Sequence, residues 1–112
     1  MSGETSYIVK HADCSQHTIF PGVNIRTTAG EKIMLSLVEF ESGAVVEEHS
    51  HPHEQAGMLI EGQLTFTIGG ATFHVEAGDM WRIPGGVLHK VVAENGPAKA
   101  LDVFHPIRED YL

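Results

Sequence analysis

Three histidines stand close together in HSHPHEQAGMLIEG, which spans residues 49–62. One residue separates His49 from His51, so on an extended strand their imidazole rings point to the same side. Two imidazoles placed in this way can bind one metal ion, because imidazole is a good ligand for Zn, Cu, Fe and Ni. The pair alone is weak evidence, since histidine pairs are common on protein surfaces. Pro52 interrupts the strand, so we expect His53 to lie in a loop.

A second stretch with an ordered spacing, GDMWRIPGGVLH, follows at residues 78–89. Five residues separate Gly78 from Pro84, and Gly86 comes two residues after that proline. Proline and glycine restrict the chain to a turn, which would deliver His89 to the start of the next strand. The first stretch has comparable spacing, with Gly43 six positions before His49.

The elements that must position these histidines are predicted to be short β-strands. Segments rich in Val, Ile, Thr and Phe are interrupted by Gly, Pro and Asn about every 8 to 12 residues, which is typical of a β-sandwich or β-barrel. We therefore predict one all-β domain over residues 1–112, with a possible helical turn at 106–112. The predicted strands are 33–40, 56–60, 64–68, 71–75, 80–83, 89–93 and 98–104.

The two spaced stretches resemble the two conserved motifs of the cupin family. The first family motif is glycine, five residues, His-x-His, three or four residues, usually glutamate, six residues and glycine, and it falls at about 43–62. The second is glycine, five residues, Pro-x-Gly, two residues, histidine and usually asparagine, and it falls at about 78–93. Two positions depart from the pattern, because Gln55 replaces the usual glutamate and Ala93 the usual asparagine.

This resemblance implies a double-stranded β-helix, or jelly-roll barrel, with a divalent metal in its mouth. The implied ligands are His49, His51, Gln55 and His89. Glu54 is a weaker alternative to Gln55, because its spacing fits neither form of the family motif. The competing interpretation is a barrel that has lost its metal and keeps hydrogen-bonded, buried histidines. The family spacing does not identify the metal, and Ni, Fe, Mn, Co and Zn all remain possible.

A glutamine ligand changes the chemistry that such a metal could support. Three imidazoles and an amide are all neutral, so the ion would keep its full charge of +2 and would act as a strong Lewis acid. The arrangement of two histidines and one carboxylate that is typical of non-haem iron oxygenases is absent. We therefore favour redox-neutral chemistry on an anionic substrate, especially a carboxylate.

The C-terminal segment AKALDVFHPIREDYL contains further candidates. Ala100, Asp102 and Phe104 share one face of the predicted strand by their period of two. A carboxylate between apolar neighbours is costly to bury, and Arg108 could fold back over the barrel mouth. Periodicity alone favours the simpler interpretation, in which Asp102 faces solvent on an edge strand and Arg108 is a surface charge.

A closer resemblance favours a functional interpretation of these residues. The run EEHSHPHEQAGMLIEG and the spacing D-x-F-x-x-x-R are similar to those of the pectin-degradation cupins known as KdgF. This resemblance implies conversion of cyclic 4,5-unsaturated uronates, released by pectin or alginate lyases, into linear 5-keto-4-deoxyuronate. It implies a catalytic role for Asp102 and substrate binding by Phe104 and Arg108. The first 40 residues carry no comparable motif.

Composition argues against several classes of partner. The formal net charge is −8, and an acidic chain is poorly suited to nucleic acid or anionic membranes, which are themselves negatively charged. The single cysteine, Cys14, cannot form an internal disulfide. No secretory signal and no apolar run of about 18 residues is visible. We expect a cytoplasmic protein that binds a small anionic sugar and forms a homodimer.

Two other functions remain open, and a storage or purely structural barrel is a third and weaker alternative. A cupin dioxygenase would consume oxygen, whereas the expected isomerase would not. A non-catalytic cupin that binds a sugar or metabolite through its metal would show tight binding without turnover.

Overall fold

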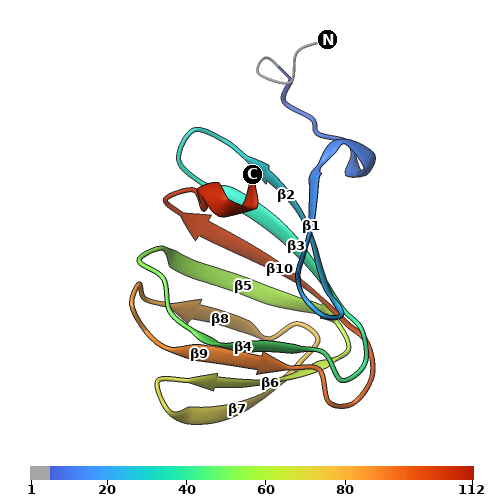
Figure 1. The fold of residues 1–112 in the computed structure, drawn as a ribbon, viewed down its shortest axis with the longest axis vertical. Coiled ribbons are helices and arrows are strands. Elements are labelled where there is room, and N and C mark those ends of the chain that lie inside the picture. The colour runs from blue at the N-terminus through green and yellow to red at the C-terminus, as the bar shows by residue number, and fades with distance from the viewer. Residues whose placement is uncertain (1–5) are drawn as a thin grey trace.

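The computed structural model describes residues 6–112, which form two antiparallel β-sheets that face each other (Figure 1). The six-stranded sheet has the order β1-β2-β3-β10-β5-β8, and the four-stranded sheet has the order β4-β9-β6-β7. The bounds are β1 Ser15–Phe20, β2 Val23–Ala29, β3 Met34–Phe40, β4 Val45–His49, β5 Glu54–Glu61, β6 Gln63–Ile68, β7 Ala71–Glu76, β8 Met80–Ile83, β9 His89–Val92 and β10 Ala98–His105. Within residues 6–112, two 3₁₀-helices, η2 (His11–Asp13) and η3 (Glu109–Tyr111), flank the sheets.

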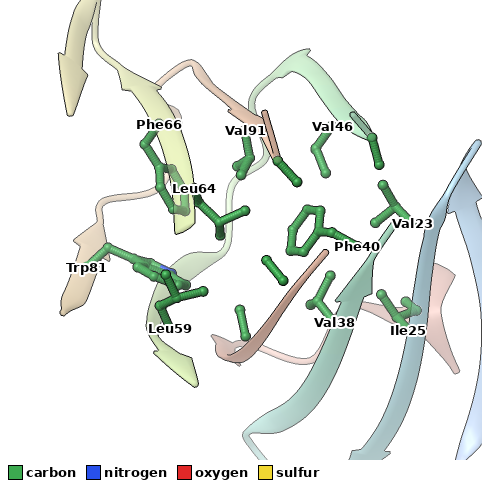
Figure 2. Close-up of a cluster of buried hydrophobic side chains, with 14 of the residues drawn as sticks. Val23, Ile25, Val38, Phe40, Val46, Leu59, Leu64, Phe66, Trp81 and Val91 are labelled. Carbon is green, nitrogen blue, oxygen red and sulfur yellow. The ribbon is translucent and has the colours of Figure 1, made fainter. Parts of the chain in front are cut away.

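The core lies between the two sheets and follows from the alternation of side chains along each strand. In β3, for example, Val38 and Phe40 are buried and Glu39 is exposed. Their inward side chains meet those of Leu64 and Phe66 from β6 (Figure 2). Burial of these apolar side chains is the main force that holds the two sheets together. The prediction of an all-β jelly roll is therefore confirmed.

Each predicted strand is present, with ends that shift by at most two residues, and the predicted C-terminal turn is the short helix η3. Strands β1, β2 and β4 were not predicted. Polar residues occupy many of their positions, as in VNIRTTA of β2 and VVEEH of β4, and these residues weaken a strand signal that depends on β-branched and aromatic side chains. Within residues 6–112, no helix is long and apolar enough to cross a membrane.

Strand β10 lies in the interior of the six-stranded sheet, between β3 and β5. The interpretation of Asp102 as a solvent-facing residue on an edge strand is therefore wrong. The strand registers place five residues side by side across the sheet, and we call these the central row. In order from β2 to β8 they are Thr27, Ser36, Asp102, Gly57 and Trp81.

Candidate metal and substrate site

The three motif histidines come together at one end of the space between the sheets. His49 ends β4 and His89 begins β9, and the two residues are direct partners in the strand register. His51 lies in the loop beyond β4, so the expectation that strand alternation alone aligns it with His49 was wrong. The loop nevertheless returns the ring to the cluster, and each of the three histidines offers a ring nitrogen within 4.8 Å of the others.

The backbone orients each of these rings through its Nδ1 atom. Each Nδ1 donates a hydrogen bond to a carbonyl oxygen two residues away: His49 to Glu47 at 2.8 Å, His51 to His53 at 3.1 Å and His89 to Val87 at 2.9 Å. In a neutral imidazole, a proton on Nδ1 leaves a lone pair on Nε2. Fixing the tautomer from outside the cluster is typical of metal-binding histidines.

The nitrogen and oxygen atoms that face one another in the cluster carry lone pairs and no protons. The Nε2 atom of His89 is buried and has no hydrogen-bond partner. The Nε2 atom of His51 lies 3.1 Å from Oε1 of Gln55, so two lone pairs face each other. Burial, with help from Arg108 and the other histidines, lowers the pKa of His51 to about 4. A divalent cation would satisfy all of these acceptors, and the residues present therefore fit a metal.

Of the two neighbouring candidates, Gln55 and Glu54, only the first lies on the side of β5 that faces the cluster. Gln55 is buried on the inner face of β5, whereas Glu54 is exposed on the outer face. Glu54 is thus excluded from the cluster, as its spacing indicated. His53 lies in the loop before β5, and its carbonyl oxygen is the acceptor for His51.

Asp102 lies close to the histidine cluster in a partly buried position. Its Oδ1 atom accepts a hydrogen bond of 2.8 Å from Nε1 of Trp81. Burial raises the pKa of Asp102 to about 6, although the hydrogen bond from Trp81, the nearby amide of Gln55 and the charge of Arg108 oppose this rise. A carboxyl group with such a pKa can both accept and release a proton near neutral pH.

Gly57 makes the contact between Trp81 and Asp102 possible. A Cβ atom at position 57 would overlap with Nε1 of Trp81 and would lie 2.5 Å from Oδ1 of Asp102. We expect Gly57→Ala to displace the indole, to lower the free energy of unfolding by about 1–3 kcal/mol and to change the fluorescence of Trp81, the only tryptophan.

The matched control is Gly30→Ala, because a Cβ atom at position 30 would meet nothing closer than 3.8 Å. Urea unfolding and emission spectra should show little change in that variant. Unchanged fluorescence and stability in Gly57→Ala would contradict the role given to this glycine.

The C-terminal tail folds over the same end of the barrel. The guanidinium carbon of Arg108 lies 5.3 Å from the ring centroid of Phe104 and 4.0 Å from that of Tyr111. One nitrogen of Arg108 pairs with Asp110 at 3.0 Å, while its Nε atom is buried without a partner. Thr27 anchors the tail by donating a 2.7 Å hydrogen bond to the carbonyl oxygen of Tyr111.

One cavity of about 40 Å³ connects these groups. Its lining includes His49, Gln55, His89, Asp102, Phe104 and Arg108, all of which are candidate residues from the sequence. It also includes Ser36, Trp81 and Tyr111, which no sequence motif marks as site residues. Alternation on β8 could have placed Trp81 on the inner face, but nothing in the sequence indicates its partner, 21 residues away.

The comparisons with known proteins agree with this architecture. The Cupin domain family pattern matches residues 36–104. The structure of KdgF from Halomonas sp. has a TM-score of 0.86 and 26% identity, over 96% of this chain and 100% of that chain. An RmlC-like cupin from Shewanella frigidimarina has a TM-score of 0.87 and 24% identity, over 96% and 97% of the two chains.

More distant structures share the fold alone. An oxalate decarboxylase variant from Bacillus subtilis has a TM-score of 0.78 and 23% identity, over 98% of this chain and 34% of that chain. No curated protein sequence matches the chain. The family match covers more than half of the 112 residues and agrees with the jelly roll and with the three-histidine cluster. The chain therefore belongs to the cupin domain family.

Proposed function

We propose that the protein converts cyclic 4,5-unsaturated uronates into linear 5-keto-4-deoxyuronate. The observation that carries this proposal is one cavity that is shared by neutral metal-binding donors, a carboxyl group of raised pKa and a guanidinium. The likeness to KdgF, which covers 96% of this chain and 100% of that chain, supports the same function. We further propose that residues 1–112 form one cupin domain that acts in the cytoplasm.

The proposed metal ligands are His49, His51, Gln55 and His89. Burial lowers the pKa values of His51 and His89, which favours their neutral forms, and the amide of Gln55 carries no charge. A divalent ion bound there would keep its full charge of +2 and would act as a Lewis acid on the substrate carboxylate. The protein's own contribution is to hold the three imidazoles in place through the backbone carbonyls that accept from each Nδ1.

Arg108 and Phe104 are placed to bind the uronate itself. The free Nε–H of Arg108 can donate to the substrate carboxylate, and a guanidinium is suited to this because it offers several donors in a fixed plane. The ring of Phe104, on the inner face of β10, can pack against the apolar face of the sugar. Arg108 and Phe104 would together hold the substrate so that its reacting atoms lie next to the carboxyl group of Asp102.

Asp102 is the proposed proton carrier. Trp81 occupies its Oδ1 atom, which leaves Oδ2 to accept the proton of the C1 hydroxyl. The bond between C1 and the ring oxygen then breaks, so an aldehyde forms at C1 and the electron pair remains on the oxygen at C5. Transfer of the proton to C4 turns the resulting enolate into a ketone at C5. The reaction is an isomerisation, since the proton lost from oxygen is regained at carbon.

The direct test uses unsaturated uronate monomer freshly generated by a lyase. Absorbance of the conjugated double bond should disappear faster with the protein than without it, and chelator should abolish the difference. Restoring Ni, Fe, Mn, Co or Zn one at a time would identify the metals that support turnover. Oxygen uptake during the reaction would favour a dioxygenase instead, and binding without loss of absorbance would favour a non-catalytic cupin.

The substitution Gln55→Glu would add a negative charge to the proposed set of neutral ligands. The added carboxylate should retain the metal, but it would reduce the local positive charge and repel the anionic substrate. We expect KM to rise by about 10-fold with little change in metal content, as measured by steady-state kinetics and elemental analysis. Gln16→Glu, at an exposed position of β1, is the matched control and should leave KM unchanged. An unaltered KM in Gln55→Glu would contradict the charge argument.

A further inference from the structure

Ser36 is a buried hydroxyl that has no hydrogen-bond partner. The residue is 1% exposed, its Oγ atom is unpartnered, and it belongs to the lining of the cavity. The strand register places it directly opposite Asp102. Residues paired in this way across antiparallel strands have Cα atoms about 4.5–5.5 Å apart, so both side chains reach the same part of the cavity.

The neighbours of Ser36 in the central row show why this free hydroxyl is unusual. On one side, the equally buried hydroxyl of Thr27 donates to the carbonyl oxygen of Tyr111 at 2.7 Å. On the other side, Asp102 accepts from Trp81. Buried polar groups in folded proteins are nearly always paired, because an unpaired one carries a desolvation cost. Alanine at position 36 would avoid that cost, which indicates that the hydroxyl serves a ligand.

We propose that Ser36 and Asp102 together form a subsite for a hydroxyl group of the substrate. A sugar hydroxyl can accept a hydrogen bond from Ser36 and donate one to the free oxygen of Asp102. The cavity of about 40 Å³ has room for such a group, since a cavity of about 10–15 Å³ already holds one water. This inference rests on the proposed function and adds an orientation for its substrate, whose hydroxyl-bearing edge would be inserted toward β3.

The test is a binding comparison between two carboxylates, using metal-loaded protein and isothermal titration calorimetry. D-Glucuronate carries hydroxyl groups and cannot undergo the proposed reaction, whereas cyclohexanecarboxylate has a ring of similar size without hydroxyls. Ser36→Ala should weaken glucuronate binding by about 5- to 10-fold, the effect of one lost hydrogen bond, and should leave cyclohexanecarboxylate binding unchanged. Equal effects on both compounds, or no preference for glucuronate in the wild type, would overturn the subsite.

Thermal unfolding separates this role from a structural one. Ser36→Ala should be as stable as the wild type or more stable, because an unpaired hydroxyl has been removed from the interior. Thr27→Val is the matched variant, and it should be destabilised, since it leaves the carbonyl oxygen of Tyr111 without its donor. If the wild type binds glucuronate through Ser36 but does not consume unsaturated uronate, the proposed reaction is wrong and the subsite stands.

Discussion

Asp102→Asn is expected to lower kcat for unsaturated uronate by about 100- to 10,000-fold, the usual contribution of a positioned general base. The amide cannot carry the proton from the C1 hydroxyl to C4. Its oxygen can still accept the hydrogen bond from Trp81 that Asp102 now receives, so the local fold should persist. Metal content should remain near one equivalent per chain, because the proposed ligands are untouched.

Asp102→Ala should show a similar loss of turnover, together with some loss of stability, since the indole N–H of Trp81 would then lack an acceptor. Glu94→Gln, at an exposed position, is the charge-matched control and should leave kcat unchanged. Rates are to be measured by absorbance and metal by elemental analysis on the same samples. Full turnover in Asp102→Asn would remove this residue from the mechanism.

His51→Ala is expected to reduce bound metal to below about a tenth of an equivalent and to abolish turnover. The histidine is buried, and its Nε2 atom lies beside both Gln55 and the other rings of the cluster. Losing one ligand of a four-donor set weakens metal binding strongly, because the remaining donors leave a coordination position open.

The loss of metal binding in His51→Ala can also be measured through thermal stability. A ligand that binds only the folded state at 100 times its Kd stabilises that state by about 2.7 kcal/mol, so chelator should lower the Tm of the wild type. The Tm of His51→Ala should not respond to chelator. His74→Ala is the control, since that exposed ring contacts only Thr65 among the side-chain hydrogen bonds of the described residues. A full equivalent of metal in His51→Ala would contradict the proposed ligand set.

Local pattern was sufficient for the fold class and for most strands. Alternation with a period of two places Val38 and Phe40 on the buried face of β3 whatever lies opposite them. The spacing of glycine, proline and histidine likewise identified the cupin motifs without any three-dimensional information. These features could be predicted because each depends on residues that are near one another in the chain.

The arrangement of the site depended on contacts between distant segments. His51 reaches the cluster through a loop rather than through strand alternation, and Arg108 lies over the cavity because the tail is anchored to β2. The sequence could not show that β10 is an interior strand, which is why periodicity alone favoured a solvent-facing Asp102.

By itself, then, the sequence determined an all-β fold, because strand period and turn chemistry act over a few residues. Its resemblance to the cupin motifs implied the candidate donor set His49, His51, Gln55 and His89. Only the tertiary structure decided that Trp81 holds Asp102 and that the hydroxyl of Ser36 is left free. Strand order and register bring residues from β3, β8 and β10 into one row. Pairing over such separations is set by the packing of the whole barrel, and no short stretch of sequence encodes it.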